Sequence, residues 1–163
     1  MKKIARIALT AVAAVLAANA LVHATPRTDG TAAFARNNYA VAVIKIRPLA
    51  ERGDAQAQAQ LGFMYEHGRG VPQDYVAAVR WYMCAAEQGY PTAQYLLGLM
   101  YDKGHGVPRS DVLAYKWLNL AAAGAQPRAR EYYLRIRDAV AAKLTAKQVA
   151  EAQWLASGFV PRR

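Results

Sequence analysis

Apolar residues recur at helical spacing in the middle of the chain. Ala57, Leu61 and Tyr65 are four residues apart, so they share one face of a helix. Ala78 and Trp81 begin a second apolar stripe of the same kind. Between the stripes the chain is polar and rich in Gly and Pro, which stop helices and form turns. The pattern predicts a helix, a seven-residue loop and a second helix.

The same pattern returns one unit later. Of the 36 positions in residues 57–92, sixteen are identical in residues 93–128. Self-similarity at a period of 20–50 residues is typical of stacked repeats, in which each unit buries the apolar face of its neighbour. The sequence therefore predicts an array of helix pairs.

Glycine falls at the same places in both copies. Gly62 and Gly98 stand inside the predicted first helices, where Gly costs about 1 kcal/mol relative to Ala. A repeated cost at one position predicts that a second helix passes too close to admit a side chain. The residues expected to maintain the repeat structure are Ala57, Leu61, Gly62, Tyr65, Gly68, Gly70, Ala78, Trp81, Ala93, Leu97, Gly98, Tyr101, Gly104, Gly106, Ala114 and Trp117.

The two copies, "AQAQLGFMYEHGRGVPQDYVAAVRWYMCAAEQG" and "AQYLLGLMYDKGHGVPRSDVLAYKWLNLAAAG", resemble the Sel-like (Sel-one-like) repeat family, which is related to the tetratricopeptide repeat. The resemblance implies an all-α fold, a short right-handed α-solenoid of stacked antiparallel helix pairs. It also implies that the first helix of each pair lines a concave face. Members of the family typically serve as non-catalytic protein-binding scaffolds.

The flanking segments read as divergent units of the same array. We expect a helix pair at 25–54, repeats at 55–90 and 91–126, and capping helices at 127–163. Thr145 and Gln148 fit a capping box at the start of the last helix. About eight helices in four pairs are predicted.

The N-terminal residues 1–24 have the features of a bacterial signal peptide. Lys2 and Lys3 precede an apolar run at 7–22, and small residues precede a cleavage site after Ala24. A cut after Ala20 is the alternative site, and an uncleaved anchor is the alternative interpretation. The run has 16 residues, whereas a bilayer-spanning helix needs about 20. We expect a periplasmic or secreted protein.

The inner face of the predicted solenoid is the candidate binding groove. Exposed apolar and aromatic side chains at equivalent positions are the usual anchors for a bound segment of another protein. The alternative is that Phe63 and Leu99 pack against a neighbouring helix. The groove residues expected from the helical wheel are Gln56, Gln60, Phe63, Thr92, Tyr95, Leu96, Leu99, Arg128, Tyr132 and Arg135.

Positive charge collects near the C-terminus. The chain has a formal net charge of +10. Residues 125–163 contain three acidic residues, and their basic residues are Arg128, Arg130, Arg135, Arg137, Lys143, Lys147, Arg162 and Arg163. The ordinary interpretation is a solvated helix surface. The functional alternative is binding of anionic polysaccharide, polymer or lipid head groups. No nucleic-acid recognition module is visible, so nucleic acid is not expected as a partner.

The sequence offers no catalytic motif. His67 and His105 have no second His or Cys at ligand spacing, so neither a metal nor a cofactor is expected. Cys84 is the one cysteine, and its helical surroundings predict a buried thiol. Relatives linked to β-lactam chemistry have cysteine pairs in each repeat, which this chain lacks. We expect a protein that is not an enzyme.

Overall fold

The computed structural model describes residues 29–162, and these residues form helices and no strand. The predicted all-α solenoid is confirmed. The predicted signal peptide, 1–24, and its cut after Ala24 lie outside the described residues. The helices are α2 (Asp29–Ala35), α3 (Tyr39–Glu51), α4 (Ala55–His67), α5 (Tyr75–Glu87), α6 (Pro91–Lys103), α7 (Asp111–Gly124), α8 (Pro127–Ala141) and α9 (Ala146–Ser157).

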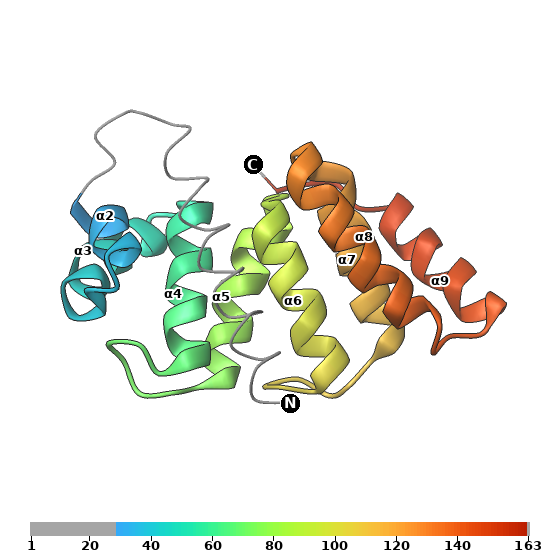
Figure 1. Cartoon of the computed structure of the whole chain (residues 1–163), viewed down its shortest axis with the longest axis horizontal. Coiled ribbons are helices and arrows are strands. Elements are labelled where there is room, and N and C mark those ends of the chain that lie inside the picture. The colour runs from blue at the N-terminus through green and yellow to red at the C-terminus, as the bar shows by residue number, and fades with distance from the viewer. Residues whose placement is uncertain (1–28, 163) are drawn as a thin grey trace.

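The helices stack along one axis, from α2 at one end to α9 at the other (Figure 1). Helices α2 and α3, α4 and α5, and α6 and α7 pack as pairs, and α3, α5 and α7 each contact the first helix of the next pair. One core runs through the stack, because each pair buries an apolar stripe against its neighbour.

Local residues set the helix ends. The carboxylates of Asp54 and Asp74 accept hydrogen bonds from the first turns of α4 and α5, and the Ser110 hydroxyl does the same for α7. The predicted capping box of Thr145 and Gln148 starts α9. Seven residues separate α4 from α5, as predicted, and seven separate α6 from α7.

The paired helices approach closely at their internal glycines. A Cβ atom on Gly62 would lie 2.6 Å from the Tyr82 ring and 3.2 Å from the Ala78 carbonyl oxygen. On Gly98 it would lie 2.8 Å from Cγ of Leu118. A second helix thus occupies the space of a side chain in both repeats.

The loops also contact the preceding pair. Gly70 has a φ of +72°, and a Cβ atom there would lie 2.6 Å from the Tyr39 carbonyl oxygen. Gly106 has a φ of +71°, and its Cβ would overlap the carbonyl oxygen of Tyr75. Tyr39 and Tyr75 are equivalent residues of consecutive units, so each loop packs on the start of the previous second helix.

The C-terminal end departs from the repeat. Helix α9 packs mainly against α7. After α9 the chain returns across α7, where Phe159 makes an edge contact with Trp117 at 5.8 Å between ring centroids. The Arg162 amide then donates to the Glu87 carbonyl at the end of α5. Within residues 29–162, no helix has both the length and the apolar character needed to cross a bilayer.

Candidate functional site

One hydrogen bond recurs at each joint between helix pairs. The side-chain amide of Gln58 on α4 donates to the Ala50 carbonyl of α3 at 3.1 Å. One unit later, Gln94 on α6 donates to the Ala86 carbonyl of α5 at 3.2 Å. Each bond ties a first helix to the end of the preceding second helix.

The third joint keeps this bond with a different residue. Arg130 on α8 donates from Nε to the Ala122 carbonyl of α7 at 3.1 Å. Positions 58, 94 and 130 are 36 residues apart, as are the three acceptors at 50, 86 and 122. Helices α4, α6 and α8 therefore share one register, and equivalent residues lie in rows across them.

Three rows contain nearly all the predicted groove residues. The rows are Gln56, Thr92 and Arg128; Gln60, Leu96 and Tyr132; and Phe63, Leu99 and Arg135, with Tyr95 beside them. Their exposure changes along the stack. Arg128 and Arg135 on α8 are exposed, and Gln56, Leu99 and Tyr132 are half-buried.

Five of the predicted groove residues are buried: Gln60, Phe63, Thr92, Tyr95 and Leu96 are 1–3% exposed. The expectation of an exposed aromatic anchor at position 63 is wrong, because the Phe63 ring packs edge-on against Phe34 of α2 and stacks on His67 at 4.2 Å. The partner-binding role of this set stays a prediction.

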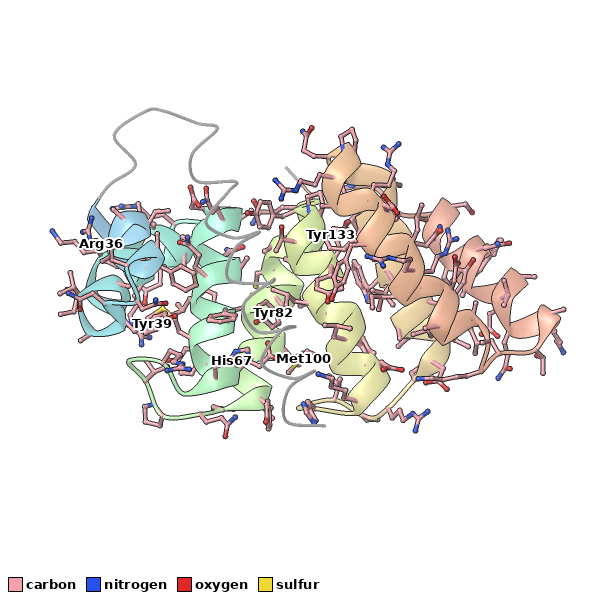
Figure 2. All side chains as sticks on the ribbon, in the orientation of Figure 1. Arg36, Tyr39, His67, Tyr82, Met100 and Tyr133 are labelled. Atoms are coloured by element: carbon pink, nitrogen blue, oxygen red, sulfur yellow. The ribbon has the colours of Figure 1, made fainter. Side chains whose placement is uncertain are left out.

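Tyr95 belongs to an aromatic joint between α6 and α8. Its ring stacks on Tyr133 at 4.6 Å between centroids, and its hydroxyl donates to the Tyr132 hydroxyl at 3.3 Å. Burial raises the pKa of Tyr133 to about 12 and that of Tyr95 well above its usual range, so both hydroxyls keep their protons at pH values where an exposed tyrosine ionises. Figure 2 shows Tyr133 between α6 and α8.

Buried polar atoms without hydrogen-bond partners occur at two of the predicted groove residues on α4, Gln56 and Gln60. Both the oxygen and the nitrogen of the Gln60 side-chain amide are buried and have no hydrogen-bond partner, and Nε2 of Gln56 is in the same state. An unpaired buried polar group costs about 1–3 kcal/mol. These unpaired atoms of Gln56 and Gln60 therefore lower the stability of the fold.

A hydrogen bond between the side chains of α4 and α5 was not evident from the sequence. The Tyr82 hydroxyl on α5 donates to Oε2 of Glu66 on α4 at 2.7 Å. Burial first, and the Glu66 charge second, raise the pKa of Tyr82. Figure 2 shows both Tyr82 and the neighbouring His67 near α4. The bond joins the two helices of the first repeat.

The basic C-terminal residues are partly engaged inside the molecule. Arg137 donates to Asn119 of α7 and to its neighbour Asp138. Lys143 pairs with Asp102 of α6, and Arg162 pairs with Glu87 of α5 at 2.8 Å. Arg128 and Lys147 remain exposed. The three engaged basic residues, Arg137, Lys143 and Arg162, thus support the fold.

Cys84 is exposed, so the predicted buried thiol is wrong. The buried residues of α5 are Ala77, Ala78, Val79, Tyr82, Ala85 and Ala86. Position 84 falls between them on the side that faces solvent.

The two histidines have aromatic partners. His67 stacks on Phe63 and its Nδ1 lies 3.0 Å from the Phe63 carbonyl oxygen. His105 stacks on Tyr75 at 4.5 Å between ring centroids. In the previous unit, the equivalent contact is the Arg69 guanidinium over the Tyr39 ring. Among residues 29–162, no three His, Cys, Asp or Glu side chains gather into a group that could hold a metal.

Comparison with known families matches the repeats themselves. The model described as Sel1 repeat matches residues 55–90 and 91–125. No curated protein matches the chain.

Two solved structures share the fold. A protective antigen of uropathogenic Escherichia coli strains that displays an SLR fold is 30% identical, with a TM-score of 0.70 over 93% of this chain. The match spans 29% of the length of that antigen. A Sel1 repeat protein from Oxalobacter formigenes is 43% identical, with a TM-score of 0.53. That match covers 58% of this chain and 71% of the other.

Proposed function

Since the chain belongs to the Sel1 repeat family, we propose that it is a non-catalytic scaffold that binds a segment of another protein along the inner face of α4, α6 and α8. The observation that supports this is the common register of the three helices, held by Gln58, Gln94 and Arg130. A surface kept in register over three helices can present side chains in rows to one continuous ligand.

The site of action proposed here is the bacterial periplasm or the medium. The support is the sequence of residues 1–24, with basic residues ahead of an apolar run and a small-residue cleavage site. Mass spectrometry of the protein recovered from the envelope fraction tests this. A mature chain beginning at Thr25 is the expected result, and an intact Met1 in the cytoplasmic fraction would contradict it.

Binding on the inner face is tested by site-specific photo-crosslinking in cells. A photoreactive amino acid at Leu99, half-buried on α6, is compared with one at Val76, which is 55% exposed on α5. We expect a discrete protein adduct from position 99 and none from position 76. Equal adducts from both positions, or none from position 99, would contradict inner-face binding.

Salt separates this function from binding through the basic C-terminal helices. Screening shortens to about 8 Å at physiological ionic strength, so attraction of anionic polymers to Arg128 and Lys147 weakens as salt rises. Because apolar anchors are less sensitive to salt, the position-99 adduct should persist in permeabilised cells at high salt. Its loss would favour the electrostatic alternative.

A further inference from the structure

We propose that the second helices carry a further binding site for a segment of another protein, formed by Trp81 of α5 and by Glu51 and Gly53 at the end of α3. The expected ligand has, in order, an aromatic residue, a spacer, a proline and an arginine. This site goes beyond the proposed function, because it lies on the second helices and not on the inner face of α4, α6 and α8.

The C-terminal residues of the chain already bind a surface of this kind. After α9 they run back to the end of α5, where Glu87 is the last helical residue (Figure 1). The Arg162 amide donates to the Glu87 carbonyl oxygen at 2.8 Å, and Nη1 of Arg162 lies 2.8 Å from Oε2 of Glu87. The last carbonyl groups of a helix have no partner within it and favour a nearby cation. Arg162 therefore binds Glu87 with its main chain and its side chain together.

Two further contacts hold the residues just before Arg162. The Phe159 ring meets Trp117 edge-on at 5.8 Å between centroids, and Trp117 is 5% exposed. Pro161 lies against Gly89, where a Cβ atom would be only 3.3 Å from Cγ of Pro161. A proline has a fixed φ and no N–H that needs a partner, which suits a segment lying across helix ends. The bound segment thus combines an aromatic ring, a proline and an arginine.

The residues that hold this segment recur one unit earlier. Positions 117, 87 and 89 correspond to Trp81, Glu51 and Gly53, and the residue type is the same at all three. Glu51 is the last residue of α3, as Glu87 is of α5. Gly53 has a φ of +94° and Gly89 one of +82°, and the amide of each donates to the carbonyl three residues before it. The two surfaces therefore share their backbone shape and their side chains.

The earlier copy is open where the later one is covered. Apart from its chain neighbours, no described atom lies within 4 Å of where a Cβ atom on Gly53 would be. Glu51 is exposed, whereas Glu87 is half-buried, and Trp81 is half-buried, whereas Trp117 is buried. A segment from another molecule can therefore reach Gly53, Glu51 and Trp81.

The bound C-terminal segment indicates the chemistry of that ligand. We expect an aromatic ring against Trp81, a proline on Gly53 and an arginine on Glu51. A second copy of this chain is not the expected ligand, because its C-terminal segment would have to give up the same contacts within its own chain. Those contacts are favoured by the high effective concentration of a tethered segment. The expected ligand is therefore a different protein.

The test uses a synthetic peptide with the sequence of residues 157–163 and the purified, isotope-labelled chain, observed by NMR. The C-terminal segment makes few contacts, so we expect weak binding, with a Kd of about 0.1–1 mM. The signals of the Gly53 amide and the Trp81 indole N–H should shift as peptide is added. Those of Gly89 and Trp117 should not, because the chain's own C-terminal segment covers them.

Charge reversal identifies the residue that binds the arginine. Glu51→Lys should weaken peptide binding about tenfold, because it removes the carboxylate and repels the arginine. The control is Glu151→Lys, the same change at an exposed residue of α9, which should leave the affinity unchanged. Peptides with alanine in place of the aromatic residue, the proline or the first arginine should also bind less tightly. These peptide changes leave the protein intact, so they cannot act through its stability.

Four outcomes would overturn the proposal. Shifts at Gly89 and Trp117 in place of Gly53 and Trp81 would mean that the peptide only displaces the chain's own C-terminal segment. Equal weakening by the two charge reversals would show general charge attraction. The absence of shifts at about 2 mM peptide would show that the site does not bind this segment. Shifts at Gly53 and Trp81 on concentrating the chain without peptide would identify a second copy as the ligand.

Leu99→Asp separates this inference from the proposed function. Leu99 lies on α6, so the change should leave peptide binding at α3 and α5 unaffected. If Leu99→Asp abolishes binding of the peptide and Glu51→Lys does not, the peptide binds the inner face and the inference is wrong, while the proposed function stands.

Discussion

The two central repeats solve the same packing problem with different residues. In the first, Gly62 of α4 lies under the ring of Tyr82, and the Tyr82 hydroxyl donates to Glu66. In the second, the equivalent Gly98 of α6 lies under Leu118, which has no polar group. In both, the carbonyl oxygen of an alanine, Ala78 or Ala114, is 3.2 Å from where a Cβ would be.

The acidic residue one turn after each glycine has a different partner in each repeat. Glu66 accepts a bond from inside its own pair, whereas the equivalent Asp102 pairs with Lys143, just beyond α8. The close backbone approach is therefore the invariant part of the repeat. The residue that fills the remaining space can change, provided that the carboxylate finds another donor.

The largest loss of stability is expected at glycines whose Cβ would overlap the backbone of the preceding pair. Gly106→Ala places a Cβ on the carbonyl oxygen of Tyr75 at a φ of +71°, so strain and overlap should lower the free energy of unfolding by about 3–5 kcal/mol. Gly70→Ala, with the equivalent contact at 2.6 Å, should cost nearly as much. Urea titration followed by circular dichroism measures both.

Gly68→Ala is the matched control for these turns. Gly68 also has a positive φ, +63°, but its Cβ would lie 3.4 Å from Cβ of Gln73, an ordinary contact. We expect a loss of about 1–2 kcal/mol, from backbone strain alone. If Gly68→Ala is as damaging as Gly106→Ala, packing of the loops on the preceding pair does not contribute to stability.

Alkaline pH should next weaken the first repeat, at Tyr82, and the contact between α6 and α8, at Tyr133. Burial raises the pKa of Tyr133 to about 12, and burial together with Glu66 raises that of Tyr82, while an unfolded tyrosine titrates near 10. The unfolded chain loses these protons first, so these tyrosines do not lower the free energy of unfolding below about pH 10. The free energy of unfolding falls as pH rises toward 12 and beyond, by roughly 3 kcal/mol for Tyr133.

Tyr82→Phe makes the first repeat resemble the second, which has Leu118 at this position. The variant should be less stable at pH 7, by about 1–3 kcal/mol, because Glu66 loses its donor. Its stability should also fall less steeply above pH 10 than that of the wild type. Urea titrations at pH 7, 9, 10 and 11 measure this, and parallel pH profiles would contradict the role of Tyr82.

The sequence predicted the parts of this structure that depend on local residues. The Gly-rich turns and the capping box of Thr145 and Gln148 act over a few residues, so their effect on helix ends can be predicted from their identity. Gly62 and Gly98 revealed a close helix approach because the same unfavourable residue recurs at the same place. The helix pairs and their stacking follow from these features.

The inner face could be predicted only in part, because its exposure depends on distant residues. Phe63 is buried by Phe34, which belongs to a divergent helix with no repeat signature. Cys84 is exposed because helix α5 turns its position outward, a detail that depends on the rotation of the helix. The bond of Arg130 was hidden because the repeat has Gln at that position in the other two units.

The joints between pairs allow a comparison of smaller effects. Gln94→Leu removes the bond to the Ala86 carbonyl, which still accepts the Gly89 amide. We therefore expect a loss of only about 1 kcal/mol. Arg130→Met should cost less, because Arg130 is exposed, and Arg130→Gln should restore the joint. Equal stability of Arg130→Met and Arg130→Gln in urea would show that the register of α8 does not depend on this bond.

The smallest effect is expected at the acid of the second repeat. Lys143 is 41% exposed in its pair with Asp102, so Lys143→Ala should lower stability by about 0.5 kcal/mol or less, since exposed ion pairs contribute little. Salt should erase this difference, because screening acts on exposed charges. The loss in Tyr82→Phe should persist at high salt, since Tyr82 is buried. Urea titrations of both variants at 0.05 and 1 M NaCl make the comparison. If both losses vanish with salt, the bond between Tyr82 and Glu66 is as exposed as the surface pair, and the two repeats do not differ in how they satisfy the acidic residue.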